Sequence, residues 1–131
     1  MLSYPITLDG VIYTHIRVMR LTRSFNVLDG ENAGRVMTGA MQRDIIGTFY
    51  NYQAEIKADP TDRAQYDAFF YAISAPVDSH TLVIPFAQTT LTFQAYVSQG
   101  QDELLVMEPS ANRWGNLSFS FIAMAPQRTP T

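Results

Sequence analysis

Cysteine is absent from this sequence of 131 residues, and its absence excludes disulfides, thiol catalysis and cysteine-ligated metal sites. No apolar run approaches the ~18 residues that a membrane-spanning helix needs. The N-terminal residues also lack the basic start and apolar core of a signal peptide. We therefore expect a soluble protein that is made in the cytoplasm and has no membrane partner.

Charge is scarce as well. Charged residues make up 16% of the chain, against about 25% in an average protein. The hydrophobic share of 47% excludes intrinsic disorder. A surface with few charged residues is compatible with partial coverage by another chain.

Basic residues are outnumbered, with nine Lys and Arg against twelve Asp and Glu and a net charge of −3. This balance gives no excess of cations to displace counterions from DNA or RNA, so we expect no nucleic-acid partner. Lys57 is the only lysine. Arginine suits ion pairs at protein interfaces better than lysine, although a compositional bias of the host genome explains the preference equally well.

Most of the chain has the alternating pattern of β-strands. Two short apolar runs flank Asp9-Gly10, a pair typical of a hairpin turn. Pro85 places its strand at a sheet edge or a bulge. Between residues 16 and 28 neither face of the expected strand is clearly polar or apolar. The expected strands cover residues 4–8, 11–13, 16–28, 45–57, 81–86, 91–97, 103–107 and 117–124.

One helix is expected between these strands. Asp59 can cap it, Pro60 suits its first position, and Asp62 favours the positive end of the helix dipole. An apolar stripe then follows at helical spacing, and the helix should end near Ser74. The stripe consists of Tyr66, Phe69, Phe70 and Ile73. The whole chain, 1–131, is predicted to form one mainly β (α+β) domain, an antiparallel β-sandwich with one flanking α-helix.

Two segments lack a regular pattern. Residues 29–44 contain three glycines and no periodicity, which indicates a loop that is mobile or ordered by a partner. Residues 126–131 are expected to form a frayed tail.

Motifs of catalysis are missing. His15 and His80 are far apart in sequence, and neither spacing nor neighbours indicate a metal site. A phosphate loop and a nucleophile elbow are absent. Adjacent Asp102 and Glu103 would point to opposite faces of a strand, so they cannot act as a carboxylate pair. We therefore predict no enzyme, no cofactor and no metal.

Two stretches, residues 34–48 and 112–122, resemble small proteins encoded in the tail-gene clusters of siphophages and prophages of Gram-positive bacteria. Those proteins combine a Gly-Arg loop and a Met-x-x-Asp step with a Trp-x-x-Leu-Ser-x-x-Phe-Ile end. The matching residues are Gly34, Arg35, Gly39, Met41, Asp44, Trp114, Leu117, Ser118 and Ile122. The likeness extends over about residues 29–124.

The resemblance implies a tail-tube-like or distal-tail-like fold and a role as a virion tail or tail-assembly protein. Its partners would be other copies of itself, in a ring or tube, and other phage tail proteins, and its location the virion tail. Methionine adapts to irregular surfaces and arginine anchors interfaces. The predicted contact residues are therefore Arg35, Met37, Met41 and Arg43, with Arg17, Arg20 and Arg23 as a second set.

Two other hypotheses stay open. A binding module, for example for cell-wall carbohydrate, would need exposed aromatic residues, and Trp114, Tyr96 and Tyr71 are the candidates. Trp114 is expected to plug one end of the β core, so its exposure would favour the binding module. A small β-rich enzyme would need His15 or His80 in a cleft with a carboxylate.

Overall fold

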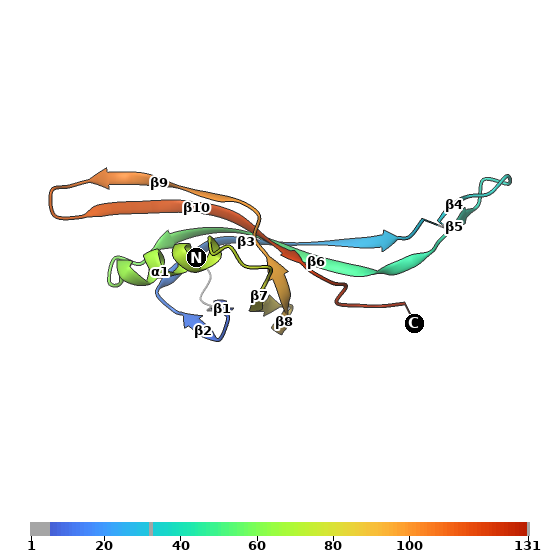
Figure 1. The fold of residues 1–131 in the computed structure, drawn as a ribbon, viewed down its shortest axis with the longest axis horizontal. Coiled ribbons are helices and arrows are strands. Elements are labelled where there is room, and N and C mark those ends of the chain that lie inside the picture. The colour runs from blue at the N-terminus through green and yellow to red at the C-terminus, as the bar shows by residue number, and fades with distance from the viewer. Residues whose placement is uncertain (1–5, 32, 131) are drawn as a thin grey trace.

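Two hairpin arms extend in opposite directions from a β-rich body in the computed structural model, which describes residues 6–31 and 33–130 (Figure 1). The elements are β1 (Ile6–Leu8), β2 (Val11–Tyr13), β3 (Ile16–Asp29), β4 (Gly34–Arg35), β5 (Met41–Gln42), β6 (Ile45–Ala58), α1 (Arg63–Ile73), β7 (His80–Phe86), β8 (Thr89–Tyr96), β9 (Gly100–Met107) and β10 (Asn112–Ala123). Each predicted strand is present, although β9 and β10 begin at Gly100 and Asn112, earlier than the predicted residues 103 and 117. Residues 4 and 5 of the first predicted strand lie outside the described residues.

The main sheet has the order β2-β1-β7-β8-β10-β6-β3, with β9 also paired to β10, and all its pairs are antiparallel. Strand β10 belongs to both layers, because residues 117–121 pair with β6 whereas Ile122 and Ala123 pair with β8. The sheet thereby folds over on itself. One layer contains β9, β10, β6 and β3, and the other contains β2, β1, β7 and β8. The predicted mainly β, antiparallel sandwich with a single helix is confirmed.

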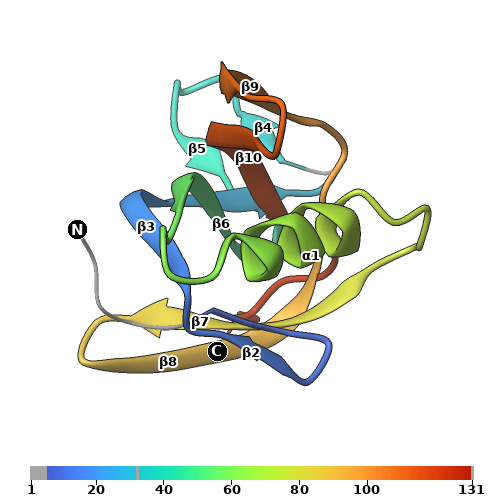
Figure 2. The ribbon, with the colours of Figure 1, turned by 90° about the vertical axis from the view of Figure 1, so that its left-hand side faces the viewer.

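Helix α1 lies between the two layers (Figure 2). Its buried side chains are Tyr66, Phe69 and Ile73. The Phe69 ring stands edge-on to Tyr13 of β2, with centroids 4.9 Å apart, and lies 5.7 Å from Phe119 of β10. One helical side chain thus joins both layers.

The start of the helix differs from the prediction. Asp62, not Asp59, is the N-cap, and its carboxylate accepts a hydrogen bond of 3.1 Å from the Gln65 N–H. Asp59 instead accepts from the N–H and hydroxyl of Thr61, in the turn before the helix. A carboxylate two residues before a backbone N–H forms such a turn as readily as a cap.

The core follows the alternation of the two central strands. Tyr52, Ala54 and Ile56 point inward from β6, as do Leu117, Phe119 and Phe121 from β10. Leu82 and Ile84 of β7 close the core from the second layer. The side chains between them on β6 and β10 face away from the core and are mostly polar.

A bulge explains the irregular pattern of β3. Val18 pairs with Ile56 and Arg20 with Glu55, so the register shifts by one residue between them. Ile16 and Val18 point inward before this shift, and Leu21 does so after it, opposite Ala54. An extra residue in one strand reverses which side of the sheet each later side chain faces.

Residues 29–44 form the end of a long hairpin rather than an irregular loop. Strands β3 and β6 pair from Ile16–Ala58 out to Asp29–Ile45, and β4 and β5 then form a small sheet of their own. Gly39, at a φ of +86°, makes the turn between them. Its N–H donates to the carbonyl of Val36 over 2.8 Å.

The C-terminal segment, predicted to be frayed over 126–131, is bound to β6 at 127–128. Thr48 donates its N–H to the Arg128 carbonyl over 2.8 Å and accepts from the Gln127 N–H over 2.9 Å. The Gln127 side-chain oxygen accepts from the Tyr50 N–H over 2.6 Å. These bonds provide partners for the backbone groups of Thr48 and Tyr50 on β6, and nothing in the sequence of the tail indicated them. Thr131 lies outside the described residues.

Candidate interaction surfaces

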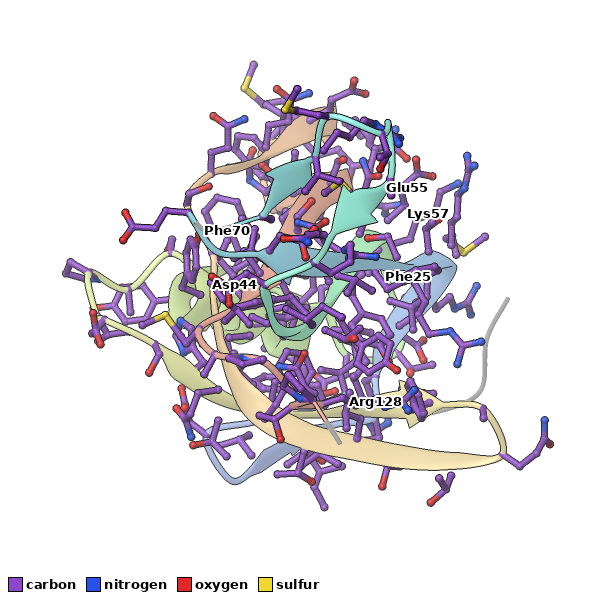
Figure 3. All side chains as sticks on the ribbon, turned by 90° about the vertical axis from the view of Figure 1, so that its right-hand side faces the viewer. Phe25, Asp44, Glu55, Lys57, Phe70 and Arg128 are labelled. Carbon is purple, nitrogen blue, oxygen red and sulfur yellow. The ribbon has the colours of Figure 1, made fainter. Side chains whose placement is uncertain are left out.

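The long arm, defined as residues 25–50, presents many apolar side chains to solvent. Phe25 is 71% exposed, and the arm ends at Met37, which is fully exposed. Val27, Leu28, Ile45 and Ile46 are also exposed large hydrophobic residues of the arm. Exposed large apolar side chains on one projecting segment are typical of surfaces that contact another protein. Figure 3 looks along the arm, with Phe25 labelled on one side of it.

The predicted contact residues of the first set gather at the end of this arm. Arg35 and Met41 face each other across β4 and β5, and Met37 lies in the turn region beyond them. Arg35 donates to the Gly39 carbonyl over 3.0 Å. Arg43 binds both oxygens of Asp29, at 2.8 and 3.0 Å, and this pairing raises the pKa of its guanidinium.

The predicted contact residues of the second set, Arg17, Arg20 and Arg23, do not share one face of β3. Arg17 and Arg20 lie on the face of β3 that points away from the core, opposite Lys57 and Glu55, respectively. Figure 3 labels Glu55 and Lys57 on the side of β6 away from the β7–β8 layer. Arg23 lies on the other face, with its guanidinium 5.0 Å from the centre of the Phe86 ring. Strict alternation would group Arg17 with Arg23, but the bulge in β3 instead puts Arg17 on the same face as Arg20 and leaves Arg23 on the other.

The outward face of the first layer is polar, and its charged side chains, Glu55 and Lys57 among them, lie on β3 and β6 rather than on residues 117–121 of β10. Ser118 and Ser120 of β10 pair with Glu55 and Gln53 of β6, and Thr22 of β3 follows opposite Gln53. A hollow of about 500 Å³ lies over this face, where β9 meets β10 and β6. Its lining includes Gln53, Gln101, Ser118 and Ser120.

Trp114 does not plug the core, contrary to the prediction. It lies on the short arm, the β9–β10 hairpin at residues 103–115, where it pairs with Leu104 and is 41% exposed. The short arm extends past the body, so its side chains lack the second layer that would bury them (Figure 1). Exposure of Trp114 is the observation named above as favouring a ligand-binding role.

A pocket of about 290 Å³ contains this tryptophan, and we call it the aromatic–acidic pocket. Its lining residues are Asp67, Phe70, Tyr71, Asp102 and Trp114. The first three recur at positions i, i+3 and i+4 of α1, which places them on one face of the helix. Sequence analysis predicted neither aspartate as a site residue. It placed Phe70 in the apolar stripe of the helix, and Phe70 does pack against the core while also lining the pocket. The helical spacing of Asp67 with Phe70 and Tyr71 was the available signal, but the position of Asp102 was not predictable from spacing.

Tyr66 holds Asp102, one of the lining residues of the pocket, in place. Its hydroxyl donates to an Asp102 oxygen over 2.9 Å. Burial and this hydrogen bond to a carboxylate both raise the pKa of Tyr66, so the hydroxyl stays protonated and holds α1 to β9.

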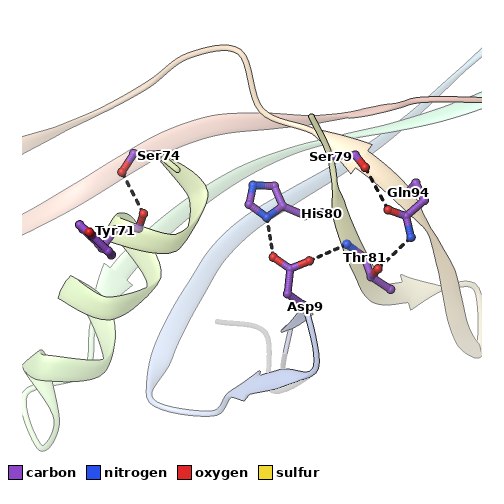
Figure 4. A network of polar contacts seen from close by, with 7 residues as sticks. All are labelled: Asp9, Tyr71, Ser74, Ser79, His80, Thr81 and Gln94. Carbon is purple, nitrogen blue, oxygen red and sulfur yellow. Dashed lines mark hydrogen bonds and ion pairs between the residues drawn. The ribbon is translucent and has the colours of Figure 1, made fainter. Parts of the chain in front are cut away.

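His80 is 3% exposed, and its ring nitrogen has a hydrogen-bond partner. Its Nδ1 lies 2.6 Å from Asp9, which also accepts a hydrogen bond of 2.8 Å from the Thr81 N–H (Figure 4). Burial favours a higher pKa for Asp9, but the bonds from His80 and Thr81 outweigh it, and the pKa is lowered overall. The pair fastens the β1–β2 turn to β7. His15 lies far from it, on the link before β3, hydrogen-bonded to Thr14 and Gln65.

The described part of the chain holds no group of three or more His, Cys, Asp or Glu side chains arranged for a metal ion. Within residues 6–31 and 33–130, no helix is long and apolar enough to cross a membrane.

Comparison with known proteins gives no assignment, because no protein-family model matches the chain and no curated protein matches it in sequence.

Proposed function

We propose that this chain is a structural or assembly protein of a phage or prophage tail. It acts through self-association and through contacts with other tail proteins, in a virion tail assembled from protein made in the bacterial host cytoplasm. The resemblance of residues 34–48 and 112–122 to tail-cluster proteins supports the tail assignment. The two arms support self-association.

The observation that carries self-association is the pair of free strand edges on one layer. Within the described residues, β3 pairs only with β6 and β9 only with β10, so each leaves a backbone edge without a partner strand. Strand β3 is 14 residues long, and its outer part carries Phe25, Val27 and Leu28 exposed. A long, exposed apolar edge is a template for pairing with another chain.

The two edges lie on opposite sides of the same layer, so β3 of one copy can pair with β9 of the next. Repetition of that joint extends the sheet through a ring or a tube. The polar outer face of β6 and β10 would then form a continuous surface along the assembly.

Light scattering across a concentration series, combined with negative-stain imaging, tests this function. We expect rings or tubes, and we expect Phe25→Asp to weaken them because it places a charge on the exposed β3 edge. Ile12→Asp is the matched control, since Ile12 is also a large, exposed apolar residue but lies on the β1–β2 hairpin. A strict monomer at every concentration would refute intrinsic self-association.

A second candidate function is a carbohydrate-binding module, which the exposure of Trp114 beside the exposed Tyr71 favours. Aromatic rings next to carboxylates can stack on a sugar and accept bonds from its hydroxyls. Titration of monomeric protein with cell-wall oligosaccharides, followed by tryptophan emission, tests it. Saturable binding that Trp114→Ala abolishes would support the module.

A further inference from the structure

We infer that the aromatic–acidic pocket receives the end of the long arm, residues 34–42, of a second copy of this chain. Arg35 then pairs with Asp67 and Asp102, and Met37 packs on Trp114. This inference rests on the proposed self-association and names the surfaces that make it.

The pocket combines negative charge with apolar surface. Asp67 and Asp102 line it together, and in the described part of the chain neither has a basic partner within ion-pair distance. One Asp102 oxygen accepts from Tyr66, which fixes the carboxylate in place. Phe70, Tyr71 and Trp114 supply the rest of the lining. Such a pocket is suited to a cation that is attached to an apolar group.

The arm end carries that combination. Arg35 has no carboxylate within ion-pair distance among the described residues, whereas Arg43 is already paired with Asp29. Met37 follows two residues later and is fully exposed. A guanidinium binds carboxylates through two parallel hydrogen bonds, and a thioether packs favourably against aromatic rings. Charge and apolar surface on the arm end therefore complement those in the pocket.

The geometry requires a second copy. The arm end and α1 lie at opposite ends of the molecule (Figure 1), so a chain cannot insert its own arm into its own pocket. Residues 38–48 alone span roughly 30 Å when extended. The arm is thus long enough to leave one body and reach another.

Trp114 makes the contact measurable, because it is the only tryptophan. The probe is a full-length Trp114→Phe variant, which keeps the arm end but emits no tryptophan fluorescence. When it is titrated into dilute wild-type protein, we expect a saturable change in Trp114 emission. Adding Arg35→Glu to the probe should weaken binding roughly tenfold or more, because a charge-assisted pair becomes a repulsion.

Matched variants separate this contact from a general effect of charge. Lys57→Glu in the probe makes the same change of charge on the outer face of the body and should leave binding unchanged. Asp67→Arg in the wild-type background should abolish the response. The Arg35→Glu probe should restore binding to the Asp67→Arg protein, because the two reversals form a new ion pair. Restoration also shows that both variants are folded.

The outcomes distinguish this contact from self-association as such. If Arg35→Glu protein assembles with an unchanged dissociation constant, the arm–pocket contact is wrong while self-association stands. If wild-type protein stays monomeric throughout, the proposed self-association fails and the contact fails with it. A response of Trp114 to cell-wall fragments, with none to the probe, would overturn the contact and assign the pocket to a carbohydrate.

Discussion

Replacing Phe69 by alanine should destabilise the fold more than any change on the outer side of α1. Phe69 is fully buried and contacts a ring from each layer, Tyr13 and Phe119. Truncation of a buried phenylalanine costs about 3–5 kcal/mol in all, and two aromatic pairs, which stabilise beyond burial alone, place Phe69 in the upper part of that range. We therefore expect Phe69→Ala to lower the free energy of unfolding by about 4–5 kcal/mol, a large part of the roughly 5–15 kcal/mol of a typical domain.

Guanidinium chloride unfolding, followed by far-ultraviolet circular dichroism, measures this loss at a concentration where the protein is monomeric. The control is Tyr71→Ala on the same helix, where an 80% exposed ring is removed and a change of about 0.5 kcal/mol or less is expected. The slope of the unfolding free energy against denaturant concentration should stay similar, because unfolding exposes nearly the same surface in each variant. A loss below about 1 kcal/mol for Phe69→Ala would show that α1 does not join the two layers.

Three further predictions concern single contacts. Tyr66→Phe should cost about 1–2 kcal/mol, and hydrogen exchange should quicken in β9, which the Tyr66 hydroxyl joins to α1. The lowered pKa of Asp9 means that its contribution to stability is present above its unfolded pKa of about 3.9 and is lost as pH falls through the folded value. Urea midpoints between pH 5 and pH 2 should therefore fall less steeply in Asp9→Asn than in wild type. Gly47→Ala should detach residues 126–130, because an added Cβ would lie 2.5 Å from the Arg128 carbonyl oxygen. Protease cleavage within that segment should then become faster, and an unchanged rate would contradict the close approach.

The body of the fold was predictable from sequence because its central strands have one buried, apolar face. Residues 52, 54 and 56, like residues 117, 119 and 121, alternate strictly with polar neighbours, and that alternation fixes which side is buried. The spacing of Tyr66, Phe69 and Ile73 fixed the helix in the same way. Both signals are local, so they appear in a short stretch of sequence.

The arms were not predictable, because no second layer covers their strands and their exposed positions carry apolar as well as polar side chains. Trp114 was expected in the core because of its residue type, and only the length of the paired strands shows that it and Phe25 lie beyond the body. The bulge after Val18 had no sequence signal of its own, since neither glycine nor proline is present there. Exposure in this protein is decided by topology rather than by hydrophobicity.

Only part of the candidate site was predictable from sequence. The glycines of residues 29–44 marked the arm end as unusual, which is why Arg35 and Met37 were predicted as contact residues. The pocket needed the register of β9 against β10 and the position of α1, which bring together Asp67 and Asp102, 35 residues apart. The proximity of these two aspartates depends on the fold of the whole chain, so no local sequence motif predicts it.

The two proposed contacts between copies contribute differently to assembly, and the Arg35→Glu variant can separate their contributions. Both are head-to-tail, because the arm end meets a pocket and β3 meets β9, rather than each surface meeting itself. A head-to-tail joint closes into a ring only if the rotation between copies divides a full turn, and otherwise it forms a filament. Pairing of strand edges alone tolerates slippage, since a shifted register still forms backbone hydrogen bonds.

The arm–pocket contact fixes that register, because Arg35 fits only where the two carboxylates lie. Arg35→Glu should therefore weaken assembly and also broaden it, from particles of one size to a mixture of sizes. Analytical ultracentrifugation at concentrations high enough to drive assembly, together with class averages from negative stain, measures this distribution. A single particle size in the variant, identical to that of wild type, would mean that the strand edges alone set the register.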